Sequence, residues 1–243
     1  NRLTEALHID RVIITPTEGT LMVKKLGFAA AKLLQELLEP DSVVAISGGS
    51  TMAAVAEEMP ILPFNPTVVP ARGGVGAVVE YQANVIASVL AERLRGTYKM
   101  LHLPDGLSQD SLHMLMTCEP QIKEIGDLIN RTDVLLFGIG TAMRMADQRH
   151  IADDVRKQLV DNHAVGEALG QYCDMDGKLI YSTNNIGLSL PDVAKVPNVI
   201  AVAGGQEKAS AIIGVMRACQ KGILIIDEQA AEGMRQLLQI SAL

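Results

Sequence analysis

One unit recurs along the chain: a short run of apolar, often β-branched residues, then a glycine-rich turn, then a helical pattern. Four copies carry glycines in the turn, and they read SVVAI-SGGST from Ser42, TVVP-ARGG from Thr67, DVLLF-GIGT from Asp133 and NVIAV-AGGQ from Asn198. A fifth copy, GILII-DEQAA from Gly222, has acidic residues in the turn instead. Buried strands that alternate with helices are typical of a parallel sheet covered on both faces. The repeat therefore predicts an α/β fold with a doubly wound, mostly parallel sheet.

The segments between these copies complete the predicted domain. The run RVIIT from Arg11 predicts a further strand, Tyr98 to Leu103 predicts another, and the apolar spacing from Thr20 to Leu38 predicts a helix. Between about Met143 and Pro191 the repeat weakens, and Tyr172 to Leu179 is typical of a hairpin on an Asp-Gly turn. We interpret this stretch as a small lobe inserted over the sheet, and residues 1–243 as one domain.

The charge balance and the few aromatic residues argue against a nucleic-acid-binding module. The chain has 21 Lys and Arg residues against 28 Asp and Glu residues, a net charge of −7, and only 3% aromatic residues with no Trp. An acidic surface repels phosphate backbones, and aromatic platforms for stacking bases are nearly absent. Three scattered cysteines without CxxC spacing, and no apolar run of about 20 residues, indicate a cytoplasmic protein with no membrane partner.

The glycine-rich turns predict an anion-binding site. In open α/β sheets, ligands bind outside the carboxyl ends of the strands. Glycines let backbone amides approach an anion, and the helix that follows presents its positive end to the same place. The turn SGGST from Ser47 adds three hydroxyl groups, which makes Gly48, Gly49, Ser50 and Thr51 the first candidates for binding a phosphate. The alternative is a tight turn in which Ser or Thr only caps the helix.

Two cations flank glycine pairs at the ends of other predicted strands. Arg72 precedes Gly73-Gly74, and Lys208 follows Gly204-Gly205 after a short step. The ends of parallel strands converge on one crevice, so we expect Arg72 and Lys208 to bind the same phosphate. A solvated surface role is the alternative for Arg72. For Lys208 that role is less favourable, because a cation in the first turn of a helix opposes the helix dipole.

A polar stretch from Asp161 to Glu167 keeps an enzyme among the alternatives. Glu167 with the nearby His163 could move a proton on a sugar phosphate, as in an isomerase or deaminase, or it could accept hydrogen bonds from ligand hydroxyls. A helix N-terminal acid is the plainer alternative. The turn GIGTAM from Gly138 lacks the third glycine of GxGxxG, so nicotinamide-dependent dehydrogenase activity is the weakest interpretation. No paired metal-ligand spacing is present, and we expect no metal and no cofactor.

Several of these motifs together resemble one family. They are SGGST from Ser47, PARGG from Pro70, PDGLSQ from Pro104, DNHAVGEALG from Asp161 and AVAGGQEKA from Ala201. Across essentially the whole chain, the sequence is similar to the effector-binding domain of SorC-type bacterial transcriptional regulators. The resemblance implies a Rossmann-like variant, related to sugar isomerases and CoA transferases, that has lost catalysis. It implies a repressor of glycolytic genes that senses fructose 1,6-bisphosphate or a related phosphosugar. It also implies a homo-oligomer that contacts operator DNA only through a separate N-terminal DNA-binding domain, which we expect to be absent from this sequence.

The resemblance also assigns roles to individual residues. It implies that Gly49, Ser50 and Thr51 bind a phosphate together with Arg72 and Lys208, and that Gln82 and Glu167 contact sugar hydroxyls. The family pattern has two consecutive arginines where this chain has Gln148-Arg149, so the contact to a second phosphate is assigned to Arg149. The complete set of predicted ligand-binding residues is Gly48, Gly49, Ser50, Thr51, Arg72, Gln82, Arg149, Glu167 and Lys208.

Overall fold

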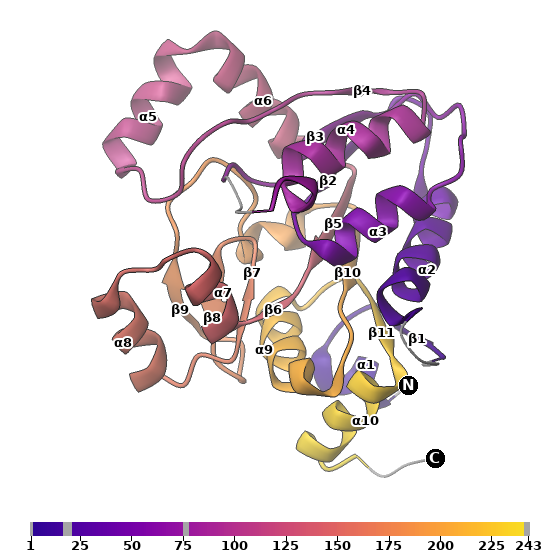
Figure 1. Cartoon of the computed structure of the whole chain (residues 1–243), viewed down its shortest axis with the longest axis vertical. Helices are drawn as coiled ribbons and strands as arrows, with labels where there is room; N and C mark the ends of the chain where they lie inside the picture. Colours follow the sequence, from indigo (N-terminus) through magenta and orange to yellow (C-terminus); the bar gives the residue numbers. More distant parts are fainter. Residues whose placement is uncertain (1, 17–20, 75–77, 241–243) are drawn as a thin grey trace.

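Over residues 2–16, 21–74 and 78–240, which the computed structural model describes, seven parallel strands form one central sheet (Figure 1). Its strand order is β1-β11-β10-β5-β2-β3-β4. From β2 the chain proceeds outward through β3 and β4, whereas β5, β10 and β11 extend the sheet in the other direction. The chain therefore switches direction between β2 and β5, where ligands bind in open α/β sheets. The strands are β1 (Arg11–Thr15), β2 (Val43–Ile46), β3 (Thr67–Pro70), β4 (Thr97–Tyr98), β5 (Val134–Gly138), β10 (Asn198–Val202) and β11 (Ile223–Asp227).

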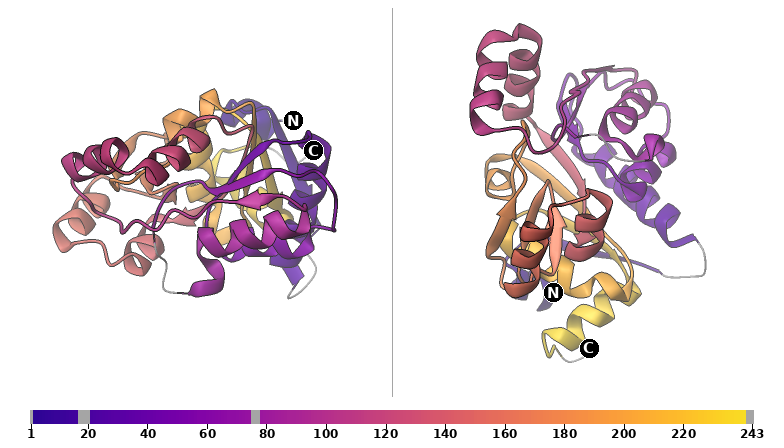
Figure 2. Two further views of the ribbon diagram at one scale, coloured as in Figure 1. Left: turned by 90° about the horizontal axis from the view of Figure 1, so that it is seen from above. Right: turned by 60° about the vertical axis from the view of Figure 1, so that its left-hand side comes forward.

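Helices cover both faces of this sheet (Figures 1 and 2). On one face pack α2 (Met22–Leu37), α3 (Ser50–Glu58) and α4 (Ala83–Arg93). The opposite core contains residues of α1 (Arg2–Leu7), α6 (Pro120–Asn130), α9 (Ala209–Cys219) and α10 (Glu228–Leu237). Along β5, Val134 and Leu136 join the first core while Leu135 and Phe137 join the second. Because successive side chains of a strand point to opposite faces, this alternation confirms the doubly wound α/β fold.

The predicted strand from Tyr98 to Leu103 is wrong beyond its first residue. The sheet gains only β4 and one further backbone bond, from Lys99 N to Val68 O at 3.0 Å. Further along, the backbone of Leu101 binds the Asn84 side chain instead of a neighbouring strand. Asn84 Oδ1 accepts from Leu101 N at 2.9 Å, and Asn84 Nδ2 donates to Leu101 O at 3.1 Å. The predicted helix from Thr20 to Leu38 is found as α2, and Thr20 itself lies outside the described residues.

A second, antiparallel sheet forms the inserted lobe, at the left of the view in Figure 1. Its order is β6-β7-β8-β9, and the predicted hairpin is confirmed as β8 and β9. The turn packs closely on α9, because a Cβ added to Gly177 would lie 2.6 Å from Ala218 N. The lobe comprises β6 (Gly140–Thr141), α7 (Ala142–Gln148), α8 (Asp153–Asp161), β7 (Gly166–Ala168), β8 (Gln171–Cys173) and β9 (Leu179–Ser182).

One more helix, α5 (Gln109–Cys118), pairs with α6 and stands out from the sheet, as the right-hand view of Figure 2 shows. Short 3₁₀ turns connect other elements: η2 (Val79–Tyr81), η3 (Leu190–Lys195) and η4 (Gln206–Lys208). Within the described ranges, no helix combines the length and the apolar character needed to cross a membrane.

Candidate functional site

The glycine-rich turn after β2 leads directly into α3, whose N-cap residue is Gly49. Gly49 has φ 113° and ψ 159°, a conformation that glycine adopts without strain. No side chain caps the helix, so the alternative in which Ser or Thr caps it is wrong. A Cβ added to Gly49 would meet no atom of the described residues within 4 Å, so the space beside the start of α3 is open at this position. The first amides of a helix have no partner within the helix and are suited to binding an anion.

Neighbouring elements hold this turn in place from two sides. The Ser47 hydroxyl accepts from Gly138 N at 3.1 Å, which ties the turn to the end of β5. On the other side, Gly49 N donates to Tyr81 O at 2.8 Å. A Cβ added to Gly48 would lie 2.7 Å from Tyr81 O and 3.4 Å from Ala83 N. The turn therefore adjoins the start of α4, where Gln82 is the N-cap residue.

Lys208 follows β10 and contacts the chain at the carboxyl end of β5, on the side of β5 opposite to β2. It lies at the end of η4 and the start of α9, and its Nζ donates to Ile139 O at 3.2 Å. Burial and then the Arg144 charge lower the pKa of Lys208, while Glu207 and Asp227 oppose the shift. Among the described residues no carboxylate forms a salt bridge with this ammonium group. We call Gly48, Gly49, Ser50, Thr51 and Lys208 the turn group, with Gln82 alongside.

The remaining predicted residues form a second constellation, where the end of β3 meets the lobe. Arg72 is only 8% exposed, and its Nη2 donates to Asp105 Oδ1 at 2.5 Å. Arg149 binds two carboxylates, since Nη1 lies 3.4 Å from Asp105 Oδ2 and Nη2 lies 3.1 Å from Glu167 Oε1. Glu167 is 3% exposed, and its Oε1 also accepts from Gly170 N at 2.7 Å. We call Arg72, Asp105, Arg149 and Glu167 the ion-pair cluster.

In the ion-pair cluster, burial lowers the pKa values of the two arginines and the neighbouring carboxylates raise them. Burial lowers the pKa of Arg72 and the Arg149 charge lowers it further, while Asp105 and Glu167 oppose the shift. For Arg149, burial lowers the pKa, but Glu167 and then Asp105 raise it by more, so the net shift is upward. Beside them, burial and then Glu167 raise the pKa of the Tyr172 phenol well above its usual value, which keeps it protonated. Arg149 Nε and the Tyr172 hydroxyl are buried and have no hydrogen-bond partner among the described residues.

The structure thus divides the predicted site residues between two groups. The charges that act on Arg72 are those of Arg149, Asp105 and Glu167, whereas Arg144, Glu207 and Asp227 act on Lys208. That Arg72 and Lys208 bind one phosphate stays a prediction. Asp105 is the one residue of the cluster that is not among the predicted site residues, although it lies in the motif PDGLSQ.

Two alternatives for Glu167 can be judged from its position. It lies in β7 and not at the start of a helix, so the reading as a helix N-terminal acid is wrong. His163 lies in the exposed turn after α8, with φ 55°, and Glu167 is held by Arg149 and Gly170 N. A carboxylate bound in this way is better placed to orient a ligand than to abstract a proton.

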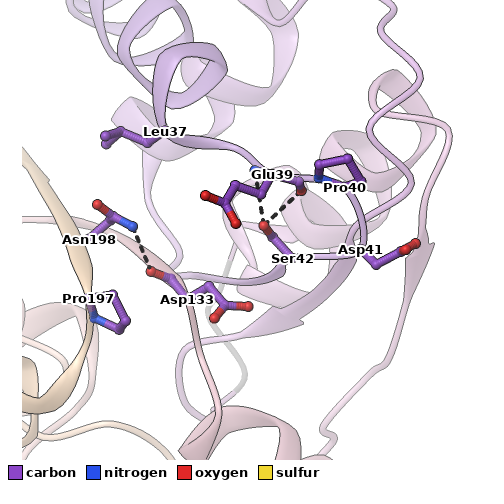
Figure 3. A pocket seen from close by; sticks show the side chains of 8 residues that line it. All are labelled: Leu37, Glu39, Pro40, Asp41, Ser42, Asp133, Pro197 and Asn198. Carbon is purple, nitrogen blue, oxygen red and sulfur yellow. Dashed lines mark hydrogen bonds between the residues drawn. The ribbon is translucent and has the colours of Figure 1, made fainter.

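Two hollows of the described surface lie away from both groups. One, of about 260 Å³, opens at the start of β2, β5 and β10 (Figure 3). It is lined by Glu39, Asp41 and Asp133, and carboxylates there would repel a phosphate. The other, of about 420 Å³, lies beside α2 and is largely apolar, with exposed Leu21 and Phe28. In the part of the chain that the structure describes, no group of three or more His, Cys, Asp or Glu residues could hold a metal ion.

Comparison with known proteins shows the class to which this fold and this site belong. Residues 1–236 match the family model described as "Putative sugar-binding domain". The chain belongs to this family, the sugar-binding domain of SorC-type transcriptional regulators.

Individual relatives place it more closely. The chain is 36% identical over 235 residues to the central glycolytic genes regulator of Bacillus subtilis (strain 168), covering 95% of this chain and 69% of the relative. It is 37% identical over 236 residues to the protein of the same name from Priestia megaterium, again covering 95% and 69%. The crystal structure of a SorC family regulator from Enterococcus faecalis matches with a TM-score of 0.87 and 35% identity, covering 96% of this chain and 97% of that one. The full-length sorbitol operon regulator SorC from Klebsiella pneumoniae has the same fold (TM-score 0.84, 21% identity, 96% and 78% covered).

These relatives are transcriptional regulators and not enzymes. The isomerase or deaminase alternative and the dehydrogenase alternative therefore find no support among them. The chain is a sugar-binding domain of a transcriptional regulator, close to the central glycolytic genes regulators.

Proposed function

We propose that this chain is the effector-sensing domain of a repressor of glycolytic genes, and that it binds fructose 1,6-bisphosphate or a closely related phosphosugar. The relatives with 36% and 37% identity are named for the regulation of glycolytic genes. A sugar bisphosphate of that pathway matches both their name and the chemistry of the predicted site.

The observation that carries the proposal is the position of Lys208 beside the turn after β2. Its ammonium group is partly buried, lies at the end of β5, and has no carboxylate salt-bridge partner among the described residues. The first amides of α3 and the hydroxyls of Ser50 and Thr51 lie at the end of the neighbouring strand. A partly buried cation near a helix N-terminus is complementary to a phosphate group.

The ion-pair cluster supplies the argument for a second anionic group on the ligand. Arg149 is the candidate contact for a second phosphate, and Glu167 and Gln82 are the candidates for sugar hydroxyls. Because Arg72 and Arg149 contact the same carboxylate, that of Asp105, we assign Arg72 to this second phosphate instead of the phosphate at Lys208. Arginine binds phosphate oxygens through two parallel N–H groups, which gives direction as well as affinity. A ligand that reaches from the turn group to the cluster would therefore carry phosphates at both ends.

Regulation requires that the ligand bind one state of the regulator better than another. We infer that a DNA-binding domain N-terminal to this one contacts the operator, and that the domain acts within a homo-oligomer. The acidic chain itself, with its net charge of −7, would then add little to the hold on DNA.

Calorimetry with four sugar phosphates tests the proposal. Fructose 1,6-bisphosphate should bind at least about tenfold more tightly than fructose 6-phosphate, because a charge-assisted hydrogen bond contributes about 1.5–3 kcal/mol. Ribose 5-phosphate and glucosamine 6-phosphate serve as further comparisons. NMR of the same mixtures should show every sugar unchanged. Rapid conversion of any of them would replace the sensor with an enzyme, and no binding of any would refute the proposed ligand class.

A further inference from the structure

Asp105 is the carboxylate that holds the two arginines of the ion-pair cluster together. It lies in the connection between β4 and α5, and its side chain is 29% exposed. Its Oδ1 accepts from Arg72 at 2.5 Å and from Asn185 Nδ2 at 2.9 Å, and its Oδ2 lies 3.4 Å from Arg149 Nη1. Glu167, with a side chain only 4% exposed, binds Arg149 from the buried side. Asp105 is therefore the more accessible of the two carboxylates.

The charges of the cluster sum to zero in this arrangement. Two guanidinium groups, of Arg72 and Arg149, face two carboxylates, of Asp105 and Glu167. A phosphate that entered without displacing either carboxylate would bring an unbalanced negative charge into a partly buried site, which is costly. Binding an anion here therefore requires that one carboxylate leave, and the accessible one can do so without crossing the interior.

The cluster also has more hydrogen-bond donors than its own carboxylates satisfy. In the part of the chain that the structure describes, Arg149 Nε and the Tyr172 hydroxyl are buried without a hydrogen-bond partner, and the raised pKa of Tyr172 keeps its proton in place. Leaving a buried donor unsatisfied costs free energy. A phosphate group offers three acceptor oxygens where a carboxylate offers two. An exchange of Asp105 for a phosphate is therefore favourable in hydrogen bonds, and it leaves less unbalanced negative charge in the site than a phosphate added beside both carboxylates.

We propose that Asp105 is an internal competitor for the ligand: its carboxylate occupies the Arg72–Arg149 pair until an anionic group of the phosphosugar replaces it. This inference rests on the proposed function and adds a displacement step to it. A ligand with only one phosphate, bound at the turn group, has no second anion to displace Asp105. The second phosphate is therefore the group of the ligand that displaces Asp105 and so changes the conformation of the protein.

Displacement of Asp105 changes the chain next to α5. Gly106, with φ 82°, follows Asp105 directly, and the Ser108 hydroxyl then caps α5 by accepting from Ser111 N at 3.1 Å. Only one residue separates Gly106 from this cap. Release of the Asp105 carboxylate thus frees the segment that leads into the projecting α5–α6 pair, which links the ligand's second phosphate to a distant surface.

The substitution Asp105→Asn tests the competition on the full 243-residue chain. It keeps the side-chain shape but removes the charge that competes with the ligand. Affinity for fructose 1,6-bisphosphate, measured by calorimetry, should rise at least about tenfold, with fructose 6-phosphate nearly unaffected. Asp127→Asn is the matched control, because it removes the same charge from an exposed pair with Lys123 in α6 and should change neither affinity.

Hydrogen–deuterium exchange of the unaltered protein gives a second test that needs no variant. Adding fructose 1,6-bisphosphate should speed exchange over residues 103–108 and slow it at the start of α3, whereas fructose 6-phosphate should produce only the second change. Equal or weaker binding of the bisphosphate by Asp105→Asn, or slower exchange over 103–108, would overturn the competition while leaving the sensor intact. No binding of either sugar to either protein would overturn the proposed function and this inference together.

Discussion

The turn group and the ion-pair cluster lie at the same edge of the sheet but meet an anion in opposite ways. In the turn group, the Lys208 ammonium has no carboxylate salt-bridge partner among the described residues, and the space beside Gly49 at the start of α3 is open. In the cluster, both arginines already bind carboxylates. The first group is prepared for a ligand, whereas the second must first release a group of the protein. Affinity for the ligand and the protein's response to it can therefore come from different parts of one site.

The largest effect that separates the two groups should come from Arg72→Ala. Removing this buried guanidinium leaves Asp105 and Glu167 with Arg149 alone, and breaking a buried ion pair from one side costs about 3 kcal/mol. The free energy of unfolding, measured with denaturant, should fall by about that amount. Arg235→Ala, which removes an exposed pair with Glu232 in α10, should cost less than about 0.5 kcal/mol. Equal small losses would show that the cluster does not stabilise the fold.

Lys208→Ala should weaken ligand binding without lowering folding stability. Affinity for fructose 1,6-bisphosphate should weaken about tenfold to a hundredfold, from the loss of about 1.5–3 kcal/mol of charge-assisted bonding. Folding stability should stay the same or rise, since burial disfavours the charged amine. Calorimetry and thermal melting measure the two quantities, and Lys123→Ala, an exposed lysine of α6, is the control. Unchanged affinity would remove Lys208 from the site.

The smallest expected effect is a pH dependence of ligand affinity, and it comes from Lys208 in the turn group. Burial and the Arg144 charge lower the pKa of Lys208, so its ammonium group loses its proton at a lower pH than an ordinary lysine. A phosphate bound beside it favours the charged form and raises the pKa again. Affinity should therefore fall as the pH rises through the alkaline range, and binding there should take up protons. Calorimetry in buffers of different ionisation enthalpy measures this uptake. Lys208→Arg, which stays charged, should abolish it, and persistence of the uptake in that variant would contradict the assignment.

Features that depend on neighbouring residues in the chain could be predicted from the sequence, whereas features that depend on distant residues could not. The main strands of the sheet are continuous apolar runs, and glycine-rich turns follow several of them directly. Short stretches of sequence are therefore enough to predict the doubly wound fold and the turn after β2. The predicted strand from Tyr98 to Leu103 failed because the Asn84 side chain binds Leu101, which lies 17 residues away.

The ion-pair cluster shows the same limit at the site. Asp105 lies 33 residues from Arg72 and 44 from Arg149, and it is placed by a connection without helical or strand periodicity. Nothing in the spacing of PDGLSQ indicates that its carboxylate meets two arginines. Arg72 and Arg149 could be singled out as cations near glycines or in a motif, but their neutralisation within the protein depends on how the lobe packs over the end of β3.

A crystal structure of the chain with fructose 1,6-bisphosphate would show which residues bind each phosphate. We expect one phosphate at the amides of Gly49, Ser50 and Thr51 with Lys208 beside it, a second phosphate at Arg149, and the Asp105 carboxylate withdrawn from both arginines. A sugar bound in either of the other hollows, or a bisphosphate bound with Asp105 still on Arg72 and Arg149, would contradict it.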